Sequence, residues 1–186
     1  SRDANLACLG QGTWGIITAS EDQLLDIEED WIPLGDECKA YDDVDGFLFL
    51  SSKEWSDHRQ NLLTKTLQKR PRPVLIGNAD LVAPRGNGFS LELGYFGHLL
   101  VDAGIPNVRF FGKPFPEVYD LVECSLPKVR LNRIVMCGDT LHTDIMGAAA
   151  RDWRTVLVTH DGLFSGHDTR KFCEKAGLFP DCRLSR

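Results

Sequence analysis

The chain has 186 residues, of which 42% are hydrophobic and 26% are charged, and its formal net charge is −6. This composition is typical of a folded protein with a sizeable core and argues against extended disorder. The acidic balance provides no basic field for nucleic-acid phosphates, and no apolar run is long enough for a membrane-spanning helix, so we expect neither nucleic acid nor membrane as a partner.

The predicted elements alternate between short apolar runs and segments of helical spacing. Several of the apolar runs are hydrophobic on both faces, which predicts buried parallel strands; they cover residues 15–18, 46–50, 73–77, 108–111, 133–137 and 155–159. Helices are predicted between them, at residues 56–69, 89–100, 116–124 and 140–150, the last with His142 or Thr143 as N-cap. Turn-rich segments at 84–88 and 104–107 are candidate linkers. The alternation predicts an α/β protein.

The cysteines indicate a reducing compartment. They stand at positions 8, 38, 124, 137, 173 and 182, without a C-x-x-C pair or a repeated zinc spacing. Cys137 lies inside an apolar run, where we expect a reduced, buried thiol. We therefore expect a cytoplasmic protein.

Lys113 follows the predicted strand at 108–111, within Gly112-Lys113-Pro114. A lysine there can offer a positive charge to a phosphoryl group that is being transferred. The alternative is a solvated lysine at the end of a strand. No glycine lies at the spacing of a Walker loop before it.

Asp139 ends another apolar run, and a predicted helix follows directly. In a doubly wound sheet, ligands bind at the carboxyl ends of the strands, and a helix N-terminus attracts anions. Because a carboxylate repels a phosphate, Asp139 in this place indicates an intervening hard cation such as Mg²⁺. Asp144, five residues later, is close enough in sequence to orient the site. The alternative is that Asp139 only ends a strand and that Asp144 is an ordinary first-turn helix residue.

These segments resemble a known family. Gly112-Lys113-Pro114, followed by the G-D-x-x-x-T-D-I sequence of residues 138–145, is similar to motifs III and IV of haloacid dehalogenase (HAD) phosphatases, in the form found in subclass IIA. That subclass includes nitrophenyl phosphatases and pyridoxal-phosphate phosphatases. Gly77-Asn78-Ala79-Asp80 resembles its T-N-P-D segment, with alanine in place of proline. The resemblance is good over residues 74–163.

The resemblance implies a Rossmann-like HAD core with an inserted α/β cap of the C2 type. It also implies Mg²⁺-dependent hydrolysis of a small phosphorylated metabolite, a phosphate monoester, through an aspartyl-phosphate. Carried over residue by residue, it makes Lys113 catalytic and Asp139 and Asp144 metal-binding. The residues that it places on the substrate side are Thr140, Thr143, Asn78 and Asp80.

The nucleophile of the family has no clear counterpart in this sequence. Asp43-Val44-Asp45-Gly46 spells D-x-D-G, but its apolar run follows it, whereas the family places the motif after a buried strand. We therefore interpret Asp43 and Asp45 as a polar turn. Thr18 resembles the strand-ending Ser or Thr of motif II, but residues 16–20 fit better as the entry into the cap. On this alignment the nucleophile segment precedes Ser1, and we expect the chain alone to be inactive.

The predicted organisation is a core remnant at 1–17, a cap at 18–107 and the HAD core at 108–186. An incomplete core sheet predicts a companion, either an oligomer or the missing N-terminal segment. The competing function is an inactive HAD-like domain that binds a phosphorylated ligand or a protein partner. The remaining histidines, among them His58, His98 and His160, lack a His or Cys as metal-ligand companion at i+4 and are interpreted as structural or solvated.

Overall fold

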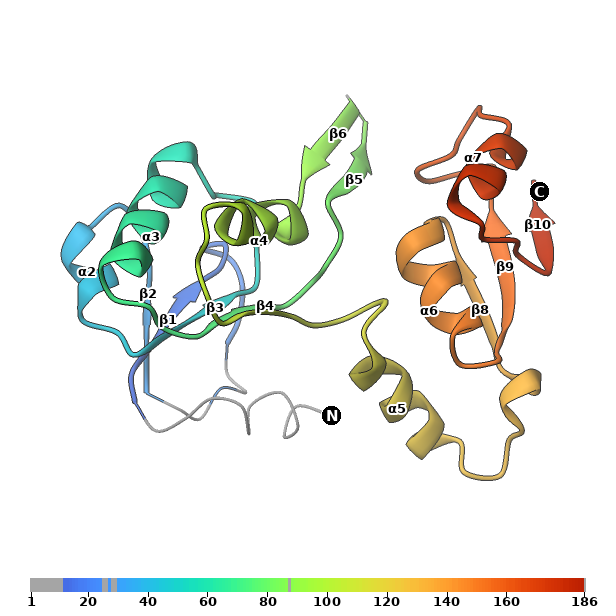
Figure 1. Cartoon of the computed structure of the whole chain (residues 1–186), viewed down its shortest axis with the longest axis horizontal. Coiled ribbons are helices and arrows are strands. Elements are labelled where there is room, and N and C mark those ends of the chain that lie inside the picture. The colour runs from blue at the N-terminus through green and yellow to red at the C-terminus, as the bar shows by residue number, and fades with distance from the viewer. Residues whose placement is uncertain (1–11, 25–26, 28–29, 87, 186) are drawn as a thin grey trace. The chain divides into compact units, whose positions relative to one another are not determined.

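The computed structural model describes residues 12–24, 27, 30–86 and 88–185 (Figure 1). They form two compact α/β units, and the predicted class is confirmed. Unit 1 extends to Val82 and resumes over Leu91–Phe111, and unit 2 comprises Ala83–Ser90 and Gly112–Arg186. No helix in the described ranges is long and apolar enough to cross a membrane.

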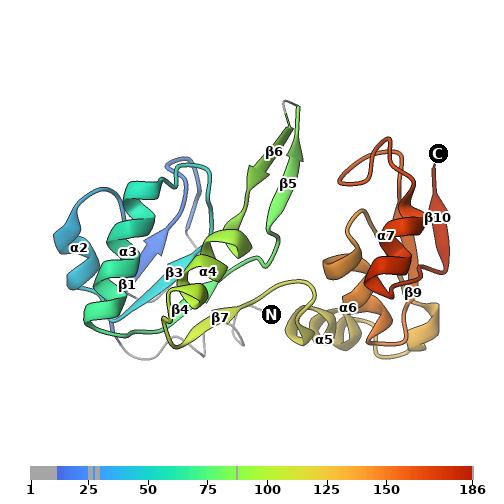
Figure 2. The same cartoon turned by 45° about the horizontal axis from the view of Figure 1, so that its top comes forward.

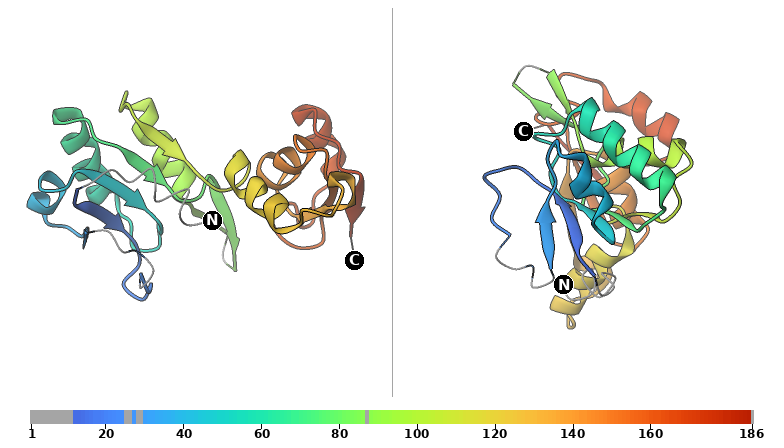
Figure 3. Two further views of the ribbon diagram at one scale, coloured as in Figure 1. Left: turned by 90° about the horizontal axis from the view of Figure 1, so that it is seen from below. Right: turned by 90° about the vertical axis from the view of Figure 1, so that its left-hand side faces the viewer.

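Unit 1 is built on a parallel sheet in the order β2-β1-β3-β4-β7. Its strands are β1 (Trp14–Ile17), β2 (Trp31–Pro33), β3 (Gly46–Phe49), β4 (Val74–Ile76) and β7 (Val108–Phe110), and its helices are α2 (Cys38–Asp42), α3 (Asp57–Lys69) and α4 (Leu93–Asp102). Alternate strand residues such as Phe47 and Phe49 share one core with Leu63 of α3 and Leu100 of α4. These helices therefore cover the same face of the sheet, as the right-hand view of Figure 3 shows.

Helix α3 illustrates how local sequence sets an element. Ser56 accepts a hydrogen bond from the Arg59 amide and caps the helix, as its Ser-Asp start predicts. Leu63 and Leu67, one turn apart, are fully buried against the sheet. Lys65, between them, is exposed, whereas Thr66 is buried and its hydroxyl donates a hydrogen bond to Asp42 Oδ1 at 2.7 Å. The apolar spacing of the helix and its packing therefore agree.

The segment predicted as a helix from residue 89 begins instead with a strand. β5 (Val82–Arg85) and β6 (Gly88–Leu91) form a two-stranded hairpin, visible in Figure 2, and α4 begins only at Leu93. Gly88 has φ +119°, a conformation that glycine allows and that closes the hairpin within the predicted linker. The residues after it pair back onto β5 instead of continuing into the helix.

The boundaries of the two units differ from the predicted ones. β1 lies between β2 and β3 in the sheet of unit 1, and β7 pairs with β4 in the same sheet. Residues 14–17 are therefore not separate from the segment predicted as the cap, and residues 108–110 do not belong to unit 2. The cause is parallel pairing between segments far apart in sequence. Residues 1–11 of the predicted remnant lie outside the described residues.

Unit 2 contains a parallel sheet in the order β10-β9-β8. Its strands are β8 (Val135–Gly138), β9 (Arg154–Val158) and β10 (Cys182–Leu184), and its helices are α5 (Pro116–Ser125), the 3₁₀ turn η1 (Leu131–Arg133), the π-helical turn η2 (Leu141–Ile145), α6 (Met146–Ala149) and α7 (Thr169–Ala176). Leu157 of β9 is fully buried and packs in one cluster with Leu141, Ile145 and Cys173. One face of the sheet is thus covered by η2 and α7.

The opposite face of this sheet carries exposed apolar residues. Val135 and Cys137 of β8 pair in register with Arg154 and Val156 of β9, which places all four on that face. Val135 is 51% exposed, and Leu184 of β10 is 47% exposed. Cys137, which we predicted to be buried, is also exposed. The reason is that β8 is an edge strand within the described part of the chain, with its outer face uncovered.

Candidate active site

A lysine and a buried aspartate form the centre of the site in unit 2. Lys113 Nζ donates to Asp144 Oδ1 at 2.5 Å, and the side chains are 41% and 3% exposed respectively. The second oxygen, Asp144 Oδ2, accepts a hydrogen bond from the Thr140 amide at 3.1 Å. Both carboxylate oxygens therefore have partners, and the buried charge is compensated by an ammonium group.

The turn that carries Asp144 is unusually wide. The amides of Asp144 and Ile145 both bond to the Thr140 carbonyl, at 3.1 and 3.2 Å, and η2 opens with Thr140 as its N-cap residue. The N-cap predicted at His142 or Thr143 is thus wrong, because the chain turns as soon as β8 ends. π-Helical turns of this kind recur at functional sites. Here the turn brings the Asp144 carboxylate back over the end of β8.

Asp139 follows β8 directly and is held by the loop after β9. Its Oδ2 accepts a hydrogen bond from the Leu163 amide at 2.8 Å. Gly162 has φ +81°, and a Cβ there would stand 2.0 Å from Asp139 Oδ2, so glycine is needed for this close approach. Thr140 Oγ1 lies 3.4 Å from Asp139 Oδ1. The carboxylate is therefore fixed at the carboxyl end of β8.

Of the two carboxylates at the carboxyl end of β8, only that of Asp139 is available to a hard cation. Asp139 offers charged oxygens of the kind that Mg²⁺ prefers, and Mg²⁺ commonly uses one or two carboxylates and completes its shell with water and substrate phosphate. Asp144, in contrast, has its oxygens occupied by Lys113 and the Thr140 amide. Over the described residues, no group of three or more His, Cys, Asp or Glu side chains is placed to hold a metal ion. The geometry thus favours Asp139 as a ligand and Asp144 as the partner of the lysine.

The two predicted threonines differ in position. Thr140 lies beside Asp139 and is partly exposed, so it is at the site. Thr143 is buried, its carbonyl accepts a hydrogen bond from the Tyr119 hydroxyl at 3.0 Å, and its own Oγ1 has no hydrogen-bond partner in the described structure. Thr143 therefore faces α5 and the core.

Asn78 and Asp80 lie in unit 1, after β4. Asn78 Oδ1 accepts a hydrogen bond from the Asp80 amide at 2.9 Å, which closes a local turn. The Asp80 carbonyl accepts from the Gly94 amide at 3.0 Å, and a Cβ on Gly94 would stand 2.2 Å from the Ala79 oxygen. This segment is therefore packed tightly against the start of α4.

The D-x-D-G sequence lies at the other end of the unit 1 sheet. Trp14 pairs with Gly46, so Asp43 and Asp45 precede β3 at the amino ends of β1 and β3. Asp45 Oδ2 accepts a hydrogen bond from the Thr13 amide at 3.0 Å. This is the position of a turn at the edge of a sheet, away from the carboxyl ends where ligands bind.

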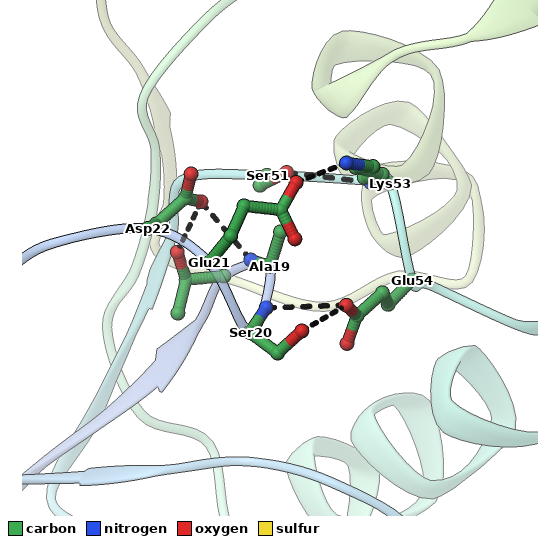
Figure 4. A network of polar contacts seen from close by, with 8 residues as sticks. Ala19, Ser20, Glu21, Asp22, Ser51, Lys53 and Glu54 are labelled. Atoms are coloured by element: carbon green, nitrogen blue, oxygen red, sulfur yellow. Dashed lines mark hydrogen bonds and ion pairs between the residues drawn. The ribbon is translucent and has the colours of Figure 1, made fainter.

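A polar network joins the loops after β1 and β3 in unit 1 (Figure 4). Thr18 Oγ1 donates to Asp22 Oδ2 at 2.6 Å, and the Ser20 amide and hydroxyl donate to Glu54 Oε1 at 3.2 and 2.6 Å. The hydroxyl of Thr18 lowers the pKa of Asp22, and that of Ser20 lowers the pKa of Glu54, below their ordinary values. These donors are paired with the protein's own carboxylates, so the network holds the two loops together.

Tyr119, Gly162 and Leu163 also belong to the site, although no pattern in the sequence points to them. An aromatic residue within a helical apolar stripe is indistinguishable from any core residue. Gly162 and Leu163 contact Asp139 although they are more than 20 positions away in the sequence; Leu163 is 24 positions from Asp139. Only the folded chain reveals such pairs.

Residues 110–181 match a family model described as HAD-hydrolase-like. No curated protein matches the sequence. Solved structures share the fold, among them a possible sugar phosphatase of the HAD superfamily from Cytophaga hutchinsonii, with 20% identity and a TM-score of 0.82 over 97% of this chain and 66% of that one. A p-nitrophenyl phosphatase from Archaeoglobus fulgidus has 18% identity and a TM-score of 0.71, over 98% of this chain and 68% of its own.

A third similar structure is a glycerol phosphate phosphatase from Mycobacterium tuberculosis in complex with calcium, with 20% identity and a TM-score of 0.61 over 83% of this chain and 45% of that chain. The chain spans about two thirds of the length of the first two structures. The fold is that of HAD phosphatases, and the predicted resemblance to the superfamily is confirmed over the segment that contains Lys113, Asp139 and Asp144.

Proposed function

We propose that this protein takes part in the Mg²⁺-dependent hydrolysis of a small phosphate monoester, with unit 2 supplying the charged half of the active site. The observation that carries the proposal is the 2.5 Å pair between Lys113 Nζ and Asp144 Oδ1, next to Asp139 at the carboxyl end of β8. A partly exposed cation held by a buried carboxylate is suited to bind a phosphoryl group without losing its orientation.

Each residue has a distinct part in the proposed reaction. Lys113 offsets the charge on the phosphoryl oxygens, Asp144 holds the lysine in place, and Asp139 binds the cation. When bound, Mg²⁺ supplies charge stabilisation and orients the phosphoryl group. Thr140, with its hydroxyl beside Asp139, and Asn78 and Asp80 of unit 1 are proposed substrate-side residues, while Thr143 acts only through the η2 turn.

The covalent steps use an aspartate supplied from outside residues 12–185. Its carboxylate oxygen forms a bond to phosphorus while the ester P–O bond breaks, and the leaving oxygen takes up a proton from water. A water molecule then attacks the phosphorus of the aspartyl-phosphate, the bond between phosphorus and the aspartate oxygen breaks, and inorganic phosphate and the free carboxylate are released. In the described residues the D-x-D pair lies at the amino end of the unit 1 sheet, so we expect no turnover from these residues alone.

A second candidate is a domain that binds a phosphorylated ligand or partner without turnover. The position of Asp43 and Asp45 favours it. They lie at the amino ends of β1 and β3, whereas ligands of parallel sheets bind at the carboxyl ends of the strands.

The proposed function also includes a polypeptide partner that adds a strand beside β8. Both faces of a parallel sheet are normally covered, and a strand inside such a sheet has a neighbouring strand on each side. The exposed Val135, Cys137 and Leu184 and the edge position of β8 in the described chain support this proposal. We further propose a cytoplasmic location, which is supported by the free state of Cys38, Cys124, Cys137, Cys173 and Cys182.

The test uses a protein in which these residues are combined with a segment that carries the nucleophilic aspartate, and it measures phosphate release from nitrophenyl phosphate and from sugar, nucleotide and pyridoxal phosphates, with and without Mg²⁺. Lys113→Met should lower turnover by orders of magnitude, because a positioned charge contributes several kcal/mol. Lys65→Met, on the exposed side of α3, is the matched control. No turnover, with phosphate binding that Lys113→Met weakens, would favour the binding domain. Turnover that survives Lys113→Met would contradict both roles of the lysine.

A further inference from the structure

We infer that Tyr119 is a positioning residue for the Lys113–Asp144 pair, acting through its hydrogen bond to the η2 turn. The inference rests on the proposed function of that pair. Tyr119 belongs to α5, which begins three residues after Lys113, and its hydroxyl donates to the Thr143 carbonyl at 3.0 Å.

One short segment therefore contacts η2 at two consecutive residues. Lys113 Nζ binds the side chain of Asp144, and Tyr119 Oη binds the backbone of Thr143. The first contact is the chemically useful one, since Lys113 is partly exposed. The second lies entirely inside the protein, where a hydrogen bond has no competition from water. The buried contact fixes the peptide from which the Asp144 carboxylate extends.

The tyrosine ring has little freedom to leave this position. Tyr119 is 1% exposed and meets Trp153 edge to face, with ring centroids 5.3 Å apart. A Cβ on Gly147 would stand 2.0 Å from Tyr119 Oη, so the glycine at this position makes room for the hydroxyl. Burial and the nearby Asp144 charge raise the pKa of Tyr119 to about 12, so the hydroxyl stays a donor at neutral pH.

The η2 turn depends on such an anchor because π-helical turns are rare and are usually held by their surroundings. Without the Tyr119 hydroxyl, the Thr143 carbonyl loses its link to α5 and keeps local backbone contacts such as that with the Met146 amide. We expect the turn to relax toward regular helix geometry. Asp144 would then move relative to both Lys113 and the Thr140 amide.

The test measures the reactivity of Lys113 toward reductive methylation, quantified by mass spectrometry of the peptide that contains it. Tyr119→Phe should raise the rate about two- to tenfold, the factor that corresponds to the loss of one buried hydrogen bond. Asp144→Asn, which removes the charged partner itself, should raise the rate at least as much and provides the upper reference.

Tyr41→Phe is the matched control. Tyr41 is also fully buried, and its hydroxyl donates to the Gly35 carbonyl at 2.8 Å, but it lies in unit 1. This variant should lose a similar amount of stability and leave the Lys113 rate unchanged. A Lys113 rate in Tyr119→Phe equal to that of the wild type, or to that of Tyr41→Phe, would overturn the inference.

Gly147→Ala provides a second variant that keeps the tyrosine. The added methyl group should push the hydroxyl away from Thr143 and raise the Lys113 rate in the same direction; an unchanged rate would again contradict the inference. Titration with inorganic phosphate, followed by ³¹P NMR, separates the two proposals. If Lys113→Met leaves phosphate binding unchanged, the proposed function fails, while the methylation rates still decide the role of Tyr119.

Discussion

Gly138 and Asp144 lie against each other at the carboxyl end of β8. A Cβ on Gly138 would stand 2.2 Å from Asp144 Cγ and 2.3 Å from its Oδ2. Since this carboxylate is also the partner of Lys113, the glycine is what allows an aspartate on the following turn to reach back over the strand and hold the lysine. Gly138 thus lies next to two carboxylates: that of Asp139, which follows it in the sequence, and that of Asp144, which packs against it in the folded chain.

A substitution at Gly138 should therefore displace the Asp144 side chain while it leaves the charged groups of the site in the sequence. Gly138→Ala is expected to lower the free energy of unfolding by about 1–3 kcal/mol, because the overlapping atoms are near backbone and cannot swing away freely. Urea denaturation followed by circular dichroism measures this change. Gly35→Ala, where nothing lies within 4 Å of the added methyl group, should stay within about 0.5 kcal/mol of the wild type. Equal stability of the two variants would show that Asp144 is not confined by Gly138.

Divalent metal should bind next to Asp139. Addition of Mn²⁺ as a paramagnetic probe is expected to broaden the amide resonances of Thr140 and Leu163, whose backbone nitrogens follow or contact this carboxylate. Asp139→Asn should weaken the effect about tenfold or more, because it removes a charged oxygen ligand. Asp161→Asn, in the exposed loop after β9, is the control. Unchanged broadening in Asp139→Asn would remove this residue from the metal site.

The stability of unit 2 should depend on acid through Asp181. Its carboxylate accepts hydrogen bonds from Arg154 Nη1 at 2.7 Å and from the Thr155 amide at 2.9 Å, joining the start of β9 to the approach to β10. The Arg154 hydrogen bond, supported by those from Thr155, lowers the pKa of Asp181 from 3.8 to about 2. A lowered pKa in the folded state means that the contribution to stability is full above the ordinary pKa and is lost as the pH falls toward the lowered one.

The measurement is the thermal midpoint as a function of pH. Asp181→Asn should lower the midpoint at neutral pH, and the gap to the wild type should close between about pH 4 and pH 2. Asp161→Asn should follow the wild-type curve. A gap that stays constant down to pH 2 would show that the charge of Asp181 contributes nothing.

The uncovered face of the unit 2 sheet should make the chain associate when it is expressed as residues 1–186. We expect oligomers that grow with concentration in light scattering, and broad thermal unfolding, because an exposed apolar face beside an edge strand favours pairing between chains. Val135→Asp should reduce this association. Val101→Asp, at a similarly exposed position of α4, should not. A monomer at all concentrations with one sharp transition would contradict the proposed strand partner.

Strong local signals made several elements predictable. β3, β4 and β8 are continuous apolar runs, β9 contains the apolar run Val156–Val158, and α3 has both a capping serine and helical spacing. β2 and β10 were missed because each has only three residues, too few for a strand pattern, and β10 is in addition exposed along its whole length. The start of α4 was misplaced because the pairing of β6 with β5 overrides the helical spacing of the same residues.

Lys113, Asp139 and Asp144 can be identified from the sequence, because they stand in motifs whose order and spacing are recognisable along the chain. How these groups pair follows only from the tertiary structure. Lys113 and Asp144 are 31 positions apart in the sequence. Whether the Asp144 carboxylate binds a metal ion or pairs with the lysine depends on the π-helical turn and on Tyr119, which binds the backbone of that turn. The division into units was likewise set by strand pairing. Local sequence fixes which groups are present, but distances between them arise only when non-local segments pack and satisfy one another's buried polar atoms.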